Sequence, residues 1–258
     1  RLPKRNTEKP RRLSPRSPLS GVVGFLDRIG FLELVPYGLI LLLIVGLMML
    51  EPHMSGTILI LAGAAAVLFA AGIKLYWFAG GGAALMGLVV LMMSGYQSTR
   101  ILVWQDPWAY PRDGGYQIIQ SLYAIGSGGL LGLGLGKSRQ KFLYLPEPEN
   151  DFIFAIVCEE LGLIGAGIVL ILFALLVMRG YWIAIHARDR FGALLVVGIT
   201  TLTAVQVFLN ISVVTNLIPT TGISLPFFSY GGTALMIQLA EMGIILSVSR
   251  QIPAPRQE

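Results

Sequence analysis

Six long apolar stretches separated by polar segments dominate the hydrophobic pattern of this chain. A bilayer core about 30 Å thick is crossed by roughly 20 helical residues, and each stretch is close to that length or exceeds it. We therefore predict an all-α, polytopic helical membrane protein with about six transmembrane helices. The predicted spans are residues 34–50, 57–73, 77–94, 152–178, 192–214 and 233–248.

The polar segments between these spans predict the orientation of the chain. Cytoplasmic segments of membrane proteins are enriched in Lys and Arg, and six spans place the main basic segments on the same side. The expected order is a basic cytoplasmic segment 1–33, three spans within 34–95, a large extracytoplasmic loop 96–151, three spans within 152–249 that include an external segment 215–232, and a cytoplasmic tail 250–258.

The loop 96–151 has a pattern of its own. Residues 116–125 place apolar side chains at helical spacing, interrupted by Gln117, Gln120 and Ser121, which predicts a helix lying on the membrane surface. Residues 126–136 are rich in glycine, which permits close approach of the backbone to another group. The segment 219–232 is interrupted by Pro and Gly and is expected to be irregular or re-entrant.

The composition agrees with membrane placement and excludes several classes of protein. Of the 258 residues, 55% are hydrophobic and 13% are charged, and the mean hydropathy is +0.72. The net charge of +5 does not indicate nucleic-acid binding, because the basic segments lack the interleaved aromatic residues that stack on bases. The single cysteine, Cys158, rules out an intrachain disulfide and a cysteine-based metal site.

The candidate chemistry lies at the boundary between the long loop and the fourth span. Arg139 and Lys141 suit an anion such as phosphate, although contact with anionic lipid headgroups is an alternative. Asp151 is a candidate catalytic carboxylate, or Asn150 or Asp151 caps a helix that begins at Phe152.

Further polar residues lie inside the predicted spans. Glu159 and Glu160 are about 100° apart on a helix, so they face different neighbours, and each either lines a polar cavity or supports the bundle. The same alternatives hold for Glu241. Gln206 and Asn210 share one helix face, which predicts hydrogen bonds to another helix.

One short catalytic pattern is set aside. Ser138-x-x-Lys141 matches the pattern of penicillin-binding enzymes, but their companion motifs are absent, so a serine acyl-enzyme is disfavoured.

Ordered sequence motifs resemble one family over more than half of the chain. The motifs are Trp104-x-Asp106-Pro107-Trp108, the glycine-rich residues 126–136, Gln140-Lys141, Tyr144-Leu145-Pro146-Glu147, Asp151-Phe152-Ile153-Phe154-Ala155, Glu159-Glu160-Leu161-Gly162, Pro219-x-Thr221-Gly222 and Ser229-Tyr230-Gly231-Gly232. In these the chain resembles the SEDS family of membrane proteins (FtsW, RodA, SpoVE), and SpoVE and FtsW in particular. That family has about ten spans, so the resemblance implies its C-terminal portion, with about four helices missing.

The resemblance implies a peptidoglycan glycosyltransferase of the bacterial cytoplasmic membrane. Such a multi-pass enzyme polymerises lipid II into β-1,4 glycan strands at the outer face, usually with a class B penicillin-binding protein, in cell division, elongation or sporulation. It also maps the proposed catalytic aspartate of the family onto Asp151. We further expect the substrate-binding residues to be Arg139, Lys141, Glu147, Gln117 and Gln120, and the supporting residues to be Glu159, Glu160, Trp104, Asp106, Ser229, Gly231 and Gly232.

The expected mechanism uses Asp151 as general base on the 4-hydroxyl of the acceptor sugar, with Arg139 and Lys141 beside the diphosphate leaving group. No cofactor is expected with certainty; a divalent cation on Glu147 or Asp151 is a candidate. Two alternatives remain open. One is a lipid II flippase whose path is lined by Asp151, Glu159 and Glu241, and the other is a noncatalytic scaffold of the cell-wall synthesis machinery.

The chain departs from the family pattern at two places. Residues 51–57 read Glu-Pro-His-Met-Ser-Gly-Thr, where the family commonly has Gln-Pro-Asp-x-Gly-Thr, so the role of that acidic residue is in doubt here. Glu149-Asn150 replaces the usual His-Thr or Gln-Thr before the catalytic aspartate, which leaves Asp151 in place.

Overall fold

The structure is a computed structural model that describes residues 31–50, 54–81, 95–112, 114–143, 145–146 and 149–252. These residues form helices and irregular segments and include no strand, which confirms the all-α prediction. The chain divides into two compact units, residues 1–52 and 53–258. The first contains α2 (Phe31–Leu50), and the described helices of the second include α3 (Met54–Ala70), α5 (Gly95–Gln105), α6 (Gly115–Gly128), α7 (Gln140–Leu143), α8 (Ile153–His186), α9 (Arg190–Val214) and α10 (Gly232–Ser249).

Three described helices are long and apolar enough to cross a membrane, namely α8, α9 and α10. Shorter apolar helical stretches occur at Leu34–Met48, within the first predicted span, and at Ser55–Ala70, which overlaps the second. Most of the predicted third span, residues 82–94, lies outside the described residues. Large apolar side chains such as Leu163, Ile171 and Leu239 are exposed on the long helices, as expected where lipid surrounds the protein. The chain is therefore a multi-pass membrane protein.

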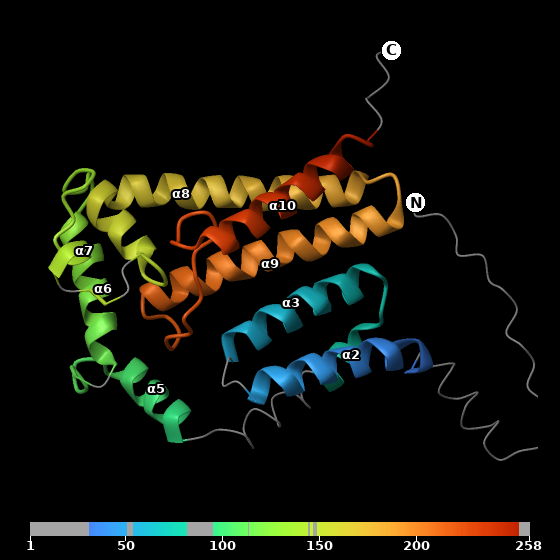
Figure 1. Cartoon of the computed structure of the whole chain (residues 1–258), viewed down its shortest axis with the longest axis horizontal. Coiled ribbons are helices and arrows are strands. Elements are labelled where there is room, and N and C mark those ends of the chain that lie inside the picture. Colours follow the sequence, from blue (N-terminus) through green and yellow to red (C-terminus); the bar gives the residue numbers. More distant parts are fainter. Residues whose placement is uncertain are drawn as a thin grey trace, which may run out of the picture. The chain divides into compact units, whose positions relative to one another are not determined.

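The second unit is organised around α8 and α9, which pack along each other (Figure 1). Helix α3 packs on α9, α6 packs on α8, and α10 contacts both long helices. Asp189 caps the start of α9 by accepting a 2.7 Å hydrogen bond from the Gly192 amide, which is a favoured N-cap arrangement. The turn between α8 and α9, residues 187–189, is short.

Helix α8 continues beyond the predicted end of the fourth span. The prediction stopped at Met178 because the uncharged apolar run stops there, but α8 continues to His186, so Arg179 lies within the helix and not in a loop. The added turns bury Ile183 and Ala184 in a second apolar cluster with residues of α9 and α10. This packing continues the helix beyond the length that a bilayer requires.

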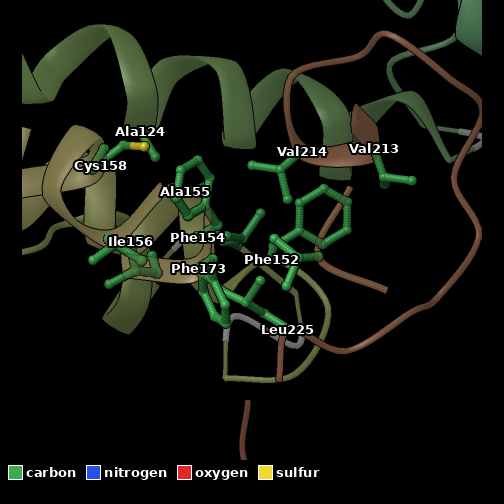
Figure 2. Packing of buried hydrophobic residues seen from close by; sticks show 14 residues of the cluster. Ala124, Phe152, Phe154, Ala155, Ile156, Cys158, Phe173, Val213, Val214 and Leu225 are labelled. Atoms are coloured by element: carbon green, nitrogen blue, oxygen red, sulfur yellow. The ribbon is translucent and has the colours of Figure 1, made fainter. Parts of the chain in front are cut away.

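The main apolar cluster lies at the opposite end of α8 (Figure 2). It joins Phe152, Phe154 and Phe173 to Val214 at the end of α9 and to Leu225 in the irregular segment before α10. Phe152 and Leu225 are each 1% exposed, and burying a side chain of this size stabilises a fold by about 1.5–3 kcal/mol. The segment that precedes α8 is thereby fixed to the α9–α10 connection.

A kink at Gly162 interrupts the hydrogen bonding of α8. Gly162 has φ 67° and ψ −170°, a conformation that side chains disfavour. The freed backbone groups pair with the glycine-rich loop: the amides of Leu133 and Gly134 donate to the carbonyls of Glu159 and Glu160 at 2.9 and 3.0 Å. In the other direction, the amides of residues 163 and 164 donate to the carbonyls of residues 129 and 130 at 2.9 and 3.2 Å.

This backbone pairing requires glycine on both sides. A Cβ on Gly132 would overlap the Glu160 carbonyl, and one on Gly162 would overlap the Gly132 amide. The glycine-rich loop therefore makes the close approach that the sequence predicts, and the group it approaches is the backbone of α8. The pairing fixes the side chain of Glu159 beside the start of α7.

The predicted surface helix at 116–125 is confirmed as a helix, α6 (Gly115–Gly128). Its face with Ile118, Ile119 and Ala124 is buried, and α6 packs on α8. The Ser121 hydroxyl donates to the Val214 carbonyl at 2.9 Å, which joins α6 to the end of α9. Its position at a membrane surface stays a prediction.

Candidate functional site

The candidate catalytic carboxylate, Asp151, is half-buried just before α8. Helix α8 begins at Ile153, and Phe152 occupies its N-cap position. Helix α8 therefore begins one residue later than predicted, and neither Asn150 nor Asp151 occupies its N-cap position. Asp151 thus lies in an irregular segment that ends at the helix.

Three donors hold the backbone of this segment. The Tyr230 amide donates to the Glu149 carbonyl at 2.7 Å, and the Ser229 hydroxyl donates to the Asn150 carbonyl at 2.6 Å. The Asn210 amide group donates to the Asp151 carbonyl at 2.7 Å. Three consecutive carbonyls are therefore fixed by residues that lie 59 or more positions away in the sequence.

Asn210 joins two segments at once. It is 1% exposed, and its side-chain nitrogen also donates to the Ile223 carbonyl at 2.7 Å. One turn earlier, Gln206 donates to the Ser224 carbonyl at 3.1 Å. The expectation that these two residues bond to another helix was wrong: their partners are backbone carbonyls of irregular segments, which have no helical hydrogen bonds of their own.

The Asp151 side chain faces the segment after α9. A Cβ built on Gly222, which has φ +71°, would lie 3.5 Å from Asp151 Oδ2. Glycine at this position therefore leaves space beside the carboxylate. Ser229, the partner of Asn150, also accepts a 2.7 Å hydrogen bond from the Leu225 amide, which fixes the fold of this segment.

A basic residue lies beside the same segment. Lys141 Nζ is 3.5 Å from Glu149 Oε1, and the two side chains are 35% and 53% exposed. An ion pair this exposed contributes little to stability, so an anion can compete for the lysine at small cost. The structure thus brings Lys141 close to the segment that carries Asp151.

A buried carboxylate holds the turn that carries both basic residues. Glu159 is 1% exposed and accepts hydrogen bonds from the Ser138 hydroxyl at 2.5 Å, the Arg139 amide at 3.1 Å and the Gln140 amide at 3.4 Å. The Lys141 amide donates to the Ser138 hydroxyl at 3.0 Å. Hydrogen bonds of this kind compensate the cost of burying a charge.

Sequence reasoning missed Ser138 as a structural residue. Its hydroxyl accepts from the amide three positions later, Lys141, at the start of the short helix α7. A serine just before a helical segment is a signal for an N-cap, and the Ser-x-x-Lys spacing at 138–141 is explained by that contact.

Arg139 lines a cavity of about 450 Å³. Gln140, Glu159 and Tyr123 contribute to its wall. Gln117 lies elsewhere: it donates to the Pro146 carbonyl at 3.2 Å and lines a separate hollow with Arg112 and Tyr116. The structure therefore does not place Gln117 in the cavity that Arg139 lines.

The remaining predicted residues lie at helix ends and turns. Trp104 Nε1 donates to the Asn216 carbonyl at 3.1 Å, and Asp106 Oδ1 accepts from the amides of residues 108 and 109 at 3.1 and 3.2 Å. Gly231 and Gly232 form the start of α10. Gln120 and Glu160 are half-buried.

The described residues include no group of three or more His, Cys, Asp or Glu side chains suited to a metal ion. Glu147, one of the two carboxylates considered for a cation, lies outside the described residues.

Comparison with known proteins places this arrangement in a family. Residues 29–253 match the family described as cell cycle protein, which comprises FtsW, RodA and SpoVE. The chain is 50% identical over 206 residues to "Stage V sporulation protein E" of Bacillus subtilis (strain 168), covering 79% of this chain and 56% of that protein. It is 44% identical over 219 residues to "Probable peptidoglycan glycosyltransferase FtsW" of Geobacter sp. (strain M18), covering 84% of this chain and 60% of that protein.

The structural comparison agrees with the sequence comparison. A chain from a solved structure described as "Structural coordination of polymerization and crosslinking by a peptidoglycan synthase complex" matches with a TM-score of 0.67 and 31% identity, covering 86% of this chain and 62% of that chain. The chain thus spans less than two thirds of the relatives it matches. Both the sequence motifs and the helical arrangement assign it to the FtsW/RodA/SpoVE family of cell cycle proteins.

Proposed function

We propose that this chain carries the catalytic residue of a peptidoglycan glycosyltransferase that polymerises lipid II into β-1,4 glycan strands. The observation that carries the proposal is the fixed segment 149–151, in which three long-range hydrogen bonds hold the backbone next to Asp151. A general base must be held within hydrogen-bond reach of the proton that it accepts. The names of the relatives, peptidoglycan glycosyltransferase among them, supply the reaction class.

In the proposed step, Asp151 accepts the proton of the 4-hydroxyl of the acceptor sugar. The hydroxyl oxygen forms a bond to the anomeric carbon of the lipid-linked donor, and the bond from that carbon to the diphosphate oxygen breaks. The electron pair leaves with undecaprenyl diphosphate, and the anomeric centre is inverted. Asp151 then releases its proton to water. A positioned base contributes a factor of about 100 to 10,000 to such a rate.

The cations act on the leaving group. Lys141 would exchange the exposed carboxylate of Glu149 for the diphosphate, and Arg139, exposed on the same turn, would add a bidentate contact. Charge that develops on the leaving oxygen is stabilised best by groups already in place. The hydrogen bonds that the Ser138–Gln140 turn donates to the Glu159 carboxylate provide that order.

The remaining substrate contacts have weaker structural support. Gln117, Gln120 and Glu147 stay proposed substrate-binding residues, and a divalent cation on Glu147 or Asp151 stays a candidate. Glu160, Trp104, Asp106, Ser229, Gly231 and Gly232 are proposed as supporting residues. Of these, Ser229 has the most direct support, since it binds the Asn150 carbonyl.

The setting is proposed as the bacterial cytoplasmic membrane, with residues 96–151 on the outer face and a class B penicillin-binding protein as partner. The related peptidoglycan synthase complex couples polymerization and crosslinking, which supports such a partner. Arg179, Arg188 and Arg190, at the other end of α8, support this orientation.

The test uses full-length protein with its penicillin-binding partner and labelled lipid II. We expect glycan polymer together with one undecaprenyl diphosphate released for each bond formed, measured by electrophoresis and by extraction of the lipid. Transfer of labelled lipid II across proteoliposomes without polymer would refute the proposal in favour of a flippase. Absence of both activities in folded complex would favour a noncatalytic scaffold.

A further inference from the structure

The far end of α8, opposite the candidate site, carries a group of side chains that the proposed function does not use. No charged residue occurs from Leu161 to Met178. These 18 residues span about 27 Å of helix at 1.5 Å per residue, close to the thickness of a bilayer core. Arg179 therefore marks the membrane boundary, and the last two turns of α8 lie at the level of the lipid headgroups.

Three side chains on these turns form a continuous stack. Arg179 Cζ lies 4.2 Å from the centroid of the Trp182 ring, and the Trp182 and His186 rings stack with centroids 4.3 Å apart and an interplanar angle of 25°. The three positions share one face of the helix and are exposed. We name them the Arg179–Trp182–His186 stack.

A hydrogen bond to the helix backbone holds the imidazole of the stack in place. His186 Nδ1 lies 2.8 Å from the Trp182 carbonyl oxygen, and because a carbonyl only accepts, this nitrogen donates. The ring orientation is therefore fixed, and it presents a flat surface for the indole. The guanidinium of Arg179 lies over this indole at cation–π distance, so the indole supports it.

More cations lie at the same end of the bundle. Arg188 and Arg190 flank the short turn after α8 and are exposed. Arg190 donates to the Ala71 carbonyl at 2.5 Å, which brings the end of α3 and the nearby Lys74 to this side. The acidic residue of the turn, Asp189, accepts from the Gly192 amide, so its charge serves the cap of α9.

We propose that the Arg179–Trp182–His186 stack binds the phosphate of an anionic phospholipid, in the leaflet opposite the one that faces Asp151. A guanidinium presents a planar fork that matches phosphate oxygens, and stacking lowers the entropy that Arg179 loses on binding. An indole at the interface contacts the glycerol and upper acyl region while its polar edge meets the headgroups. The neighbouring arginines add a positive field.

The proposal predicts a specific site and not a diffuse attraction. Arg188 provides the matched control, because it is an exposed arginine at the same end of the bundle and lies outside the stack. The stack is also remote from the reacting groups, so a loss of lipid binding can be distinguished from a loss of glycosyltransferase activity.

The experiment measures binding of phosphatidylglycerol to the full-length protein in detergent by native mass spectrometry, with phosphatidylcholine of the same chain length as reference. Circular dichroism and thermal unfolding verify that each variant is folded. We expect Arg179→Gln to weaken phosphatidylglycerol binding about 10- to 150-fold, the loss expected for a charge-assisted hydrogen bond to the phosphate. Trp182→Ala should give a comparable loss with the charge unchanged, because the guanidinium loses its support.

Arg188→Gln should weaken binding by no more than about fivefold, the effect of one diffuse charge at a membrane surface. Equal losses for Arg188→Gln and Arg179→Gln, or equal binding of the two lipids by wild-type protein, would overturn the proposal. Displacement of the lipid by inorganic phosphate at about ten millimolar would also overturn it, because the site would then recognise a free anion by the same charge-assisted contacts.

Discussion

Replacing Glu159 by glutamine tests whether the buried carboxylate holds the turn that carries Arg139 and Lys141. The carboxylate accepts from three groups, with Oε1 bound by the Arg139 amide and Oε2 bound by the Ser138 hydroxyl and, at the longer distance of 3.4 Å, by the Gln140 amide. Glutamine has almost the same size but only one oxygen. Its amide nitrogen is a donor, so it cannot accept from a backbone amide.

The loss can be worked from these contacts. At least one buried donor is left without an acceptor in Glu159→Gln, which costs about 1–3 kcal/mol. Because each 1.4 kcal/mol is a factor of ten in an equilibrium constant, the turn should open about 5 to 140 times more often. The change is local, since the backbone pairing of α8 with the glycine-rich loop does not involve the side chain.

Hydrogen–deuterium exchange over residues 138–143 measures this opening directly. The matched control is Glu160→Gln, since Glu160 is adjacent and half-buried, and its side chain forms no hydrogen bond to the residues that the structure describes. We expect faster exchange in Glu159→Gln and unchanged exchange in the control. Equal exchange in Glu159→Gln and wild type would refute the view that this carboxylate orders the turn.

Three further predictions follow from the same contacts. Gly132→Ala places a Cβ against backbone atoms and should lower the free energy of unfolding by several kcal/mol, which is measured as a lower melting temperature. Gly126→Ala, whose added Cβ would have no atom within 4 Å, should leave the melting temperature nearly unchanged. Asn210→Ala removes two 2.7 Å hydrogen bonds, one to the buried Ile223 carbonyl and one to the part-buried Asp151 carbonyl, and should destabilise by roughly 2–5 kcal/mol in denaturant unfolding; a change within experimental error would contradict the view that Asn210 holds these two segments. Lys141→Gln should slow lipid II polymerisation about 10- to 150-fold through the lost charge-assisted contact, while Glu149→Gln should stay within a few-fold of wild type; equal losses would instead indicate that the ion pair itself is required.

The helices were the most predictable part of the fold. The predicted span 192–214 corresponds to α9 (Arg190–Val214), and 233–248 to α10 (Gly232–Ser249), because each apolar run fills its helix. The end of α8 was missed, since bilayer length alone says nothing about the apolar contacts that Ile183 makes beyond the membrane boundary.

The site was predictable only in part, because its order comes from long-range contacts. A carboxylate at the end of a polar loop, Asp151, is visible in the sequence as a charge ahead of an apolar run. The residues that hold it are not: Asn210 lies 59 positions away, and Ser229 lies 79 positions from the carbonyl that it binds. Likewise the kink at Gly162 is satisfied by a loop some thirty residues earlier, a pairing that no local pattern encodes.

The central claim is that Asp151 is the general base of glycan polymerisation. The direct measurement is the rate of lipid II polymerisation by the full-length protein and its partner, compared for wild type, Asp151→Asn and Glu149→Gln. Asparagine keeps the size and the backbone contacts but cannot accept the proton, so the account predicts a loss of at least about 100-fold for Asp151→Asn and nearly wild-type rates for Glu149→Gln. Polymerisation by folded Asp151→Asn at the wild-type rate would contradict the claim.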